Sequence, residues 1–282
     1  LADFVLQPVT MDIGCVVPDT IQEIGGDVMF LGPDGLRLLS GTERNNDFGL
    51  AVVSKNIQKN FTDFINRNTN FTACLVREKS QYRIFGYNDN ITQENAQSVI
   101  ATQFAPQGND PFAFSEIRGI RAYVSDCEYV SQEEVILFAN NDGYVYNMES
   151  GNSFDGSDII ATFSTPFFPI NDPQVRKTFY KLNLYTDPQG SVSFNMSLKL
   201  DFDQSGVIQP EPIQVQNTAD QIGFYGTASY GTGNYGNKLK TVFETQVIGS
   251  GDNVSIQFNS ISTDPPFSLD ALTLEYANHG RR

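Results

Sequence analysis

Short stretches in which apolar and polar residues alternate with a period of two run through most of this 282-residue chain. Residues 191–202 show the pattern clearly, because two sets of side chains fall on opposite faces of an extended strand: Phe194, Met196, Leu198 and Leu200 against Ser193, Asn195, Ser197 and Lys199. Aromatic residues that favour strands are plentiful, with 22 Phe and 12 Tyr. The chain is therefore expected to be an all-β protein.

Residues 1–156 contain three strand–turn–strand units, at 27–40, 71–88 and 134–149. In the first, Pro33-Asp34-Gly35 supplies the turn, because Pro fixes φ and Gly accepts a positive φ. The units recur after roughly 45–60 residues, near the length of a β-propeller blade. We expect β-propeller-like blades that do not close a ring by themselves, with a plain β-sandwich of three hairpins as the alternative.

Residues 157–282 change character, because their strands are longer and alternate more regularly. A hairpin is expected around Asp187-Pro188-Gln189-Gly190, and a second over 240–263 with its turn at 249–253. A last strand is expected over 267–280. This pattern predicts a β-sandwich-like C-terminal region, separated from the first at about Ser157.

Helical periodicity is rare, and the best candidates are 43–65, with Thr42 or Ser54 as possible caps, and 92–102. The three cysteines, Cys15, Cys74 and Cys127, have no metal-ligand spacing and are expected to be buried free thiols. No apolar run approaches the roughly 18 residues of a membrane span. The net charge of −15 argues against nucleic-acid binding over the whole surface.

Catalytic and metal sites have weak support in the sequence. The only histidine, His279, lies near the end of the chain, which argues against a Ser-His-Asp triad. Carboxylate pairs for a glycosidase are abundant, but nothing selects one of them. Asp201, Asp203 and Ser205 match the first ligand positions of a calcium loop, but position twelve is Pro212. A plain acidic turn is preferred there, and no catalytic residue or cofactor is expected.

Two groups of residues suit contacts between subunits. The only compact basic cluster lies at 175–181 and contains Arg176, Lys177 and Lys181, which would face the acids of a neighbour. Residues 223–238 are rich in Gly and Tyr and predict a contact loop. The interface residues expected are Arg176, Lys177, Lys181, Tyr225, Tyr230, Tyr235, Arg281 and Arg282.

Four segments, taken in order, resemble the tail nozzle or tail-tube proteins of short-tailed bacteriophages. They are "IGCVVP" followed by "GGDVMFLGPDGLRLL" within 2–40, then 142–168, 172–202 and 264–282. The resemblance implies a propeller-type platform followed by a β-sandwich-like region. Because family members are longer, it also implies that this chain begins inside the family's propeller.

The resemblance further implies a virion protein that forms a homo-oligomeric ring, expected to be a hexamer. Such a ring binds adaptor or portal-side proteins, carries fibres or spikes, and lets genomic DNA pass through its lumen. An acidic lumen would repel the phosphate backbone and limit adhesion of DNA. A surface adhesin or carbohydrate-binding β protein is the alternative, and a propeller glycosidase is a third hypothesis.

Overall fold

The computed structural model describes residues 13–40, 52–104, 112–217, 222–223, 234–235 and 241–279, with the backbone alone at 217, 222–223 and 234–235. The chain divides into two compact units, Leu1–Ser150 and Gly151–Arg282, a few residues before the border expected after residue 156. Most of the described elements are strands in small, mainly antiparallel sheets, and none of these sheets closes on itself. The prediction of an all-β protein is therefore confirmed.

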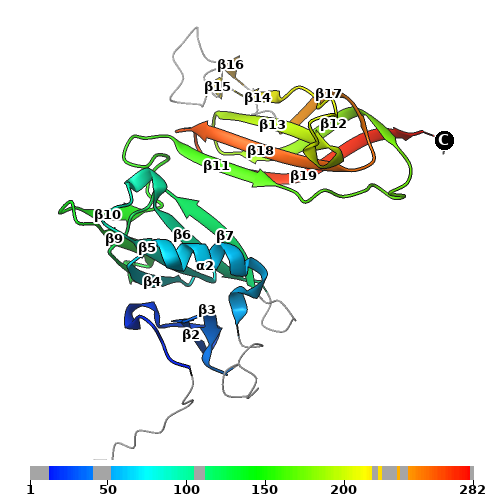
Figure 1. Ribbon diagram of the computed structural model, residues 1–282. Coiled ribbons are helices and arrows are strands. Elements are labelled where there is room, and N and C mark those ends of the chain that lie inside the picture. Colours follow the sequence, from blue (N-terminus) through cyan, green and yellow to red (C-terminus); the bar gives the residue numbers. More distant parts are fainter. Residues whose placement is uncertain are drawn as a thin grey trace, which may run out of the picture. The chain divides into compact units, whose positions relative to one another are not determined.

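The first unit contains three antiparallel sheets (Figure 1). The first sheet has the order β1 (Gln22–Ile24), β2 (Asp27–Gly32) and β3 (Gly35–Leu38), after η1 (Pro18–Thr20). The second has the order β4 (Asn70–Val76), β5 (Gln81–Tyr87), β6 (Gln97–Gln103) and β7 (Phe112–Arg118). The third has the order β10 (Val145–Met148), β9 (Glu133–Ala139) and β8 (Val124–Val130). The helical segments are η2 (Val53–Ile57), α2 (Gln58–Arg67) and η3 (Gln93–Asn95).

The four-stranded sheet β4–β7 has a buried layer on each face. On one face, Phe71 and Ala73 of β4 join Phe61 and Phe64 of α2, together with side chains of β2 and β3, in one apolar core. On the other face, Thr72 of β4 hydrogen-bonds with Ser125 of β8. This two-sided burial explains why the centre of β4 is apolar or small on both faces.

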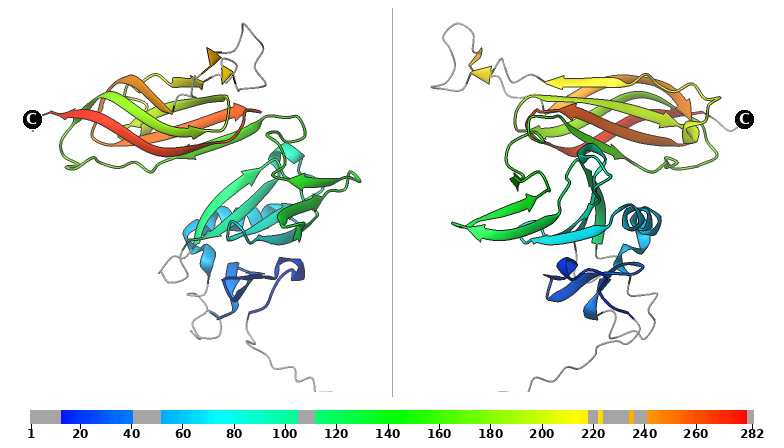
Figure 2. Two further views of the ribbon diagram at one scale, coloured as in Figure 1. Left: turned by 180° about the vertical axis from the view of Figure 1, so that it is seen from behind. Right: turned by 60° about the vertical axis from the view of Figure 1, so that its left-hand side comes forward.

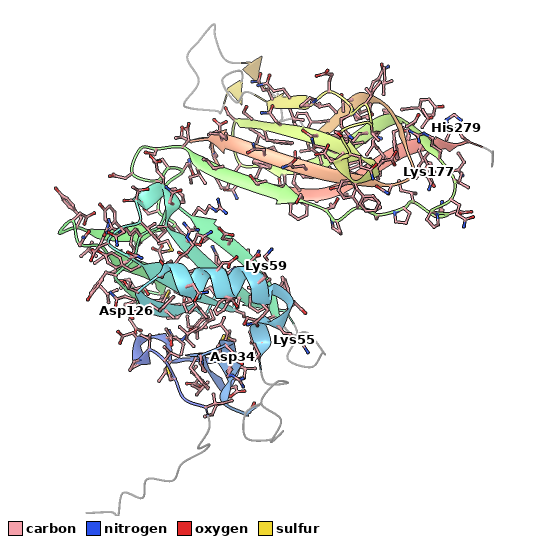
Figure 3. The ribbon with its side chains drawn as sticks, viewed as in Figure 1. Asp34, Lys55, Lys59, Asp126, Lys177 and His279 are labelled. Atoms are coloured by element: carbon pink, nitrogen blue, oxygen red, sulfur yellow. The ribbon has the colours of Figure 1, made fainter. Side chains whose placement is uncertain are left out.

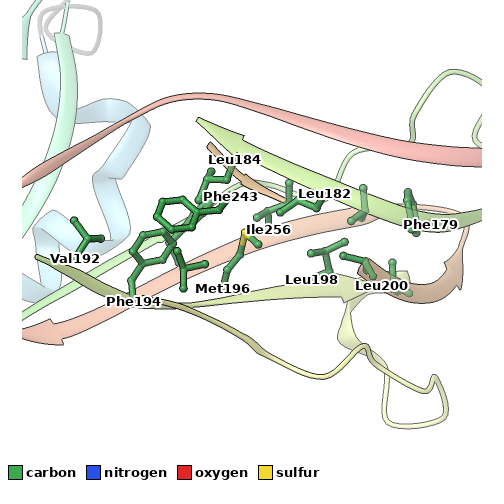
Figure 4. Close-up of a cluster of buried hydrophobic side chains, with 14 residues drawn as sticks. Phe179, Leu182, Leu184, Val192, Phe194, Met196, Leu198, Leu200, Phe243 and Ile256 are labelled. Atoms are coloured by element: carbon green, nitrogen blue, oxygen red, sulfur yellow. The ribbon is translucent and has the colours of Figure 1, made fainter. Parts of the chain in front are cut away.

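The second unit is a β-sandwich (Figure 2). One sheet has the order β11 (Ile159–Ser164), β18 (Val254–Ser262), β13 (Val192–Leu200) and β14 (Ile213–Asn217), and the other has the order β17 (Val242–Gly251), β12 (Lys177–Pro188) and β19 (Phe267–Asn278). Both sheets contribute to a single core, in which Leu182 and Leu184 of β12 share the interior with Met196 and Leu198 of β13 (Figure 4). A turn, η4 (Asp201–Asp203), follows β13, and a two-stranded parallel pair is formed by β15 (Ile222–Gly223) and β16 (Asn234–Tyr235).

The three hairpins expected in the first unit are confirmed as the pairs β2–β3, β4–β5 and β9–β10. The two hairpins expected in the second unit are wrong. The turn after β12 leads to β13, and the turn after β17 leads to β18, but each turn joins strands of opposite sheets. β12 pairs instead with β17 and β19, because every one of these strands carries a single apolar face that must close over the shared core.

The helix expected over 92–102 is also wrong, because only Gln93–Asn95 is helical and residues from Gln97 form β6. Of the helix expected over 43–65, residues 43–51 and its possible cap Thr42 lie outside the described residues. Ser54 does not cap the helix, since its hydroxyl accepts a hydrogen bond from the Leu36 backbone N–H at 3.1 Å. A closed propeller is not confirmed by these sheets.

All three cysteines are free, with Cys74 and Cys127 buried and Cys15 half-buried. Burial raises the pKa of the Cys74 thiol to about 11, so it stays protonated at neutral pH. Among the helices in the described ranges, none has the length and apolar character needed to cross a membrane.

Candidate assembly surface

The three-stranded sheet β8–β10 has one covered and one open face. Its register places Cys127, Ile136 and Met148 side by side, and all three are buried. Residues one position along each strand point to the opposite face. There the register aligns Val124 with Ala139 and Val145.

The covered face is fastened to the turn between β4 and β5 by Glu134. Its carboxylate accepts the backbone N–H groups of Arg77 at 2.6 Å and Glu78 at 2.9 Å. Burial by itself raises the pKa of Glu134. These backbone hydrogen bonds, the Cys127 thiol and the charge of Arg77 together outweigh burial and hold the pKa below its ordinary value. Glu134 therefore fixes the position of β9 against the neighbouring sheet.

Glu149 makes a second attachment just after β10. It binds Arg83 of β5 at 2.6 Å and Lys79 of the β4–β5 turn at 2.8 Å. The Arg83 side chain is only 3% exposed, and its Nη1 also lies 3.3 Å from the Met148 sulfur. The two attachments, by Glu134 and Glu149, make the sheet a rigid platform rather than an independent flap.

The open face, which we call the β8–β10 outer face, carries aliphatic side chains at both ends and at Leu137, with carboxylates between them. Val124, Val130, Leu137 and Val145 are 53%, 58%, 40% and 69% exposed. The same face carries three carboxylates and no basic side chain: Asp126, Glu128 and Glu133.

The sequence of β9 also indicates that another surface packs against this face. Val135, Ile136, Leu137 and Phe138 form an uninterrupted apolar run, which is typical of a strand buried on both faces. Here only Ile136 and Phe138 are buried, while Leu137 is exposed. Several exposed aliphatic side chains on one face of a rigid sheet are a feature that suits contact with a partner.

The basic cluster that was expected to contact a neighbour is engaged within the second unit. The Arg176 guanidinium donates to the Ser250 carbonyl at 2.8 Å and lies 3.7 Å from Asp201. Lys181 pairs with Glu244 at 3.0 Å, and this hydrogen bond raises the pKa of Lys181.

Lys177 is 1% exposed in the second unit, where the register pairs it with Asn278 of β19 (Figure 3). It donates to the backbone carbonyls of Asp172 and Asp252, the latter at 3.2 Å. Lys177 therefore offers no charge to a neighbour without leaving this site. Of the other expected interface residues, Tyr225, Tyr230, Arg281 and Arg282 lie outside the described residues, and Tyr235 is described only by its backbone in β16.

The acidic turn at 201–203 has internal partners for both of its carboxylates. Asp201 accepts the backbone N–H of Asp252 at 2.7 Å, and Asp203 lies 3.3 Å from the Lys199 ammonium. All three residues of the turn have a positive φ. Within the ranges that the structure covers, no three His, Cys, Asp or Glu side chains gather to form a metal site.

The comparison with known proteins identifies no family for this chain. Neither the known family models nor the curated proteins contain a match to this chain.

Sequence reasoning missed the β8–β10 outer face, although a signal was present. The strand 124–130 has apolar residues in both alternation phases, so its pattern does not say which face is buried. The continuous apolar run in β9 is the signal that identifies a strand needing cover on both faces.

Proposed function

We propose that this chain is a structural subunit of a phage tail, in which identical copies form a ring around a DNA channel. The ring would belong to the virion, would bind adaptor or portal-side proteins, and would carry fibres or spikes. The observation that carries the proposal is the β8–β10 outer face, where four exposed aliphatic side chains lie on a rigid sheet. The tail assignment itself comes from the resemblance in sequence.

A subunit role explains why the sheet is firmly fixed on one face and open on the other. Association buries apolar surface, and each square ångström removed from water contributes about 25 cal/mol. The flanking carboxylates Asp126, Glu128 and Glu133 would select a partner surface that carries basic groups. A heterologous contact of this kind, repeated between copies, closes into a ring when the rotation allows it.

The finer architecture belongs to the same proposal. The sheets β1–β3, β4–β7 and β8–β10 follow one another in sequence, and buried side chains join each to the next. Face-to-face packing of successive small antiparallel sheets is also how propeller blades are arranged. We propose that these sheets are blade-like parts of a platform that other chain segments or other copies complete.

The charge of the chain suits a conduit for DNA. With a net charge of −15, a ring presents acids to its lumen unless basic residues are concentrated there. Acidic walls repel phosphates and prevent the tight adhesion that Lys and Arg contacts produce. This proposal gives the chain a mechanical and electrostatic role without a catalytic step.

Electron microscopy of the purified chain tests the proposal. We expect rings of uniform size whose central channel is lined mainly by carboxylates. Particles that remain single copies at every concentration, or rings with a basic lumen, would contradict it. Labelling of the chain in intact virions would then place the ring in the tail.

A second candidate, a glycan-binding protein, is favoured by the outer face of the β11–β18–β13–β14 sheet. The register aligns Thr162, Asn259, Asn195 and Gln214 across the four strands, and Ser197 with Gln257 beside them. These side chains are uncharged in a strongly acidic chain, and amides and hydroxyls suit neutral sugars. Binding to neutral glycans that is lost in Asn195→Ala, in a chain that stays monomeric, would favour this candidate over the ring.

A further inference from the structure

A groove with a volume of about 520 Å³ lies in the first unit between α2 and strands β6 and β7. Its apolar floor is formed by Phe61, Phe64, Val99 and Phe114. Arg67 and Arg118 lie at its rim. Among the described strands, β7 pairs only with β6, so one edge of the sheet is open beside the groove.

The rim holds two arginines and two carboxylates, and the contact that each arginine makes there uses only one of its N–H groups. Arg67 donates to Gln97 Oε1 at 2.7 Å, and Gln97 donates to Glu116 Oε1 at 2.8 Å. Arg118 Nε donates to the same Glu116 oxygen at 2.6 Å, and its side chain is 68% exposed. Asp63 also lines the groove, on the helix side. Arg118 directly, and Arg67 through Gln97, are therefore linked to the same oxygen of Glu116. The other N–H groups of the two arginines can bind the carboxylate of a partner.

The tip of the β8–β9 hairpin has the complementary chemistry. Its two-residue turn has positive φ at Ser131 (53°) and Gln132 (75°), the geometry of a tight type I′ turn. Val130 is 58% exposed beside this turn. Glu128 and Glu133 lie on the same outer face as Val130. The tip thus presents one apolar side chain between two carboxylates on a rigid hairpin.

The groove and the tip are on opposite sides of the β4–β7 sheet and at opposite ends of it. The tip lies beside the β4–β5 turn, where Glu134 binds the Arg77 N–H. The groove lies at the other end, where Gln97 of β6 pairs with Arg118 of β7. α2 packs on one face of this sheet, and β8 contacts the other. A tip therefore reaches a groove only in another copy of the chain.

We propose that the β8–β9 tip of one copy inserts into the α2–β7 groove of the next copy. Val130 then covers the apolar floor, and Glu128 and Glu133 meet Arg67 and Arg118. The contact is head-to-tail, so each copy uses a different surface on each side, as a ring requires. The inference rests on the proposed function, since it names the joint by which the subunits associate.

A charge-swap cycle on the full chain tests this joint by sedimentation velocity. Glu133→Arg and Arg118→Glu are each expected to weaken association about tenfold, which corresponds to about 1.4 kcal/mol. The double variant is expected to recover most of that loss, because the ion pair is rebuilt with reversed polarity. Glu23→Arg in β1 is the matched control, because it makes the same change of charge at an exposed site away from both surfaces.

Hydrogen exchange gives a readout that needs no substitution. As the wild-type chain associates, backbone amides of Phe112–Arg118 and of the hairpin tip should both gain protection. Association that is unaffected by both single variants, without such protection, overturns the joint but leaves the ring intact. A wild-type chain that never associates overturns the ring as well.

Discussion

Glu149 shows how single charged residues build the framework of the first unit. It follows β10 and binds Arg83 and Lys79 of the neighbouring hairpin. Burial by itself raises the pKa of Glu149, but hydrogen bonds from Lys79 and Arg83 outweigh it and hold the pKa below the ordinary value of 4.5. A carboxylate with a lowered pKa stabilises the fold above its unfolded pKa, and this stabilisation is lost as the pH falls through the folded value.

We therefore expect Glu149→Gln to lower the free energy of unfolding by about 1–3 kcal/mol at neutral pH, because Arg83 stays buried without its charged partner. The difference from wild type should shrink in acid, where Glu149 itself becomes protonated. Urea unfolding at several pH values measures this, with the exposed Glu133→Gln as control. A difference that does not change with pH would contradict the role given to the ion pairs.

Lys177 and Lys181 separate a structural role from an interface role. Lys177→Met should destabilise the second unit by about 1–3 kcal/mol, because two inward-facing carbonyls lose their donor. Lys181→Met should leave stability nearly unchanged, since its ion pair lies near the surface. Neither variant should alter association. Thermal unfolding measures the stability of both variants, and sedimentation velocity measures their association. A loss of association in Lys177→Met would support the interface that was expected from the sequence.

At the scale of elements, the sequence was a good guide to strands and a poor guide to their partners. The turn signal at 33–35 and the strand–turn–strand unit at 134–149 mark true hairpins, because the flanking strands have complementary faces within one sheet. Asp187-Pro188-Gln189-Gly190 is just as strong a turn signal, yet it carries the chain between sheets. A turn signal reports a change of direction, whereas the partner strand is chosen by how the apolar faces close over the core.

The same limit applied to the candidate site. The cations of 175–181 were visible in the sequence, but their partners Ser250, Asp252 and Glu244 lie 63 to 75 residues away along the chain. The apolar run of β9 was visible too, but its open face depends on which sheet covers the other side.

The contact between α2 and β5 gives a prediction for an element. Gly86 of β5 lies under the helix, and a Cβ at this position would be 2.8 Å from the Phe64 ring and within contact of the Asn68 side-chain amide. Gly86→Ala should therefore push α2 from the sheet and destabilise the first unit by about 1–3 kcal/mol. Calorimetry should show the loss in the unfolding of that unit. Gly206→Ala, where no atom lies within 4 Å, is the control, and equal effects of both would contradict the packing.

At the scale of the whole molecule, two β units with separate cores share a strongly acidic chain. The charged side chains of the expected basic cluster bind partners within the same copy of the chain. Within the described part of the chain, the β8–β10 outer face combines exposed aliphatic side chains with three carboxylates. We therefore propose that each copy is stable by itself and acts through its contacts with other copies.

The molecular mass in solution of the wild-type chain and of Val130→Asp, measured side by side by sedimentation velocity, tests this central claim most directly. Val130 is 58% exposed at the tip of the outer face, and Ile208→Asp, at a side chain 92% exposed in the second unit, is the control. We predict that wild type and Ile208→Asp form a single closed oligomer, and that Val130→Asp sediments as a folded monomer. A wild-type chain that is monomeric at every concentration, or a Val130→Asp chain that assembles normally, would contradict the claim.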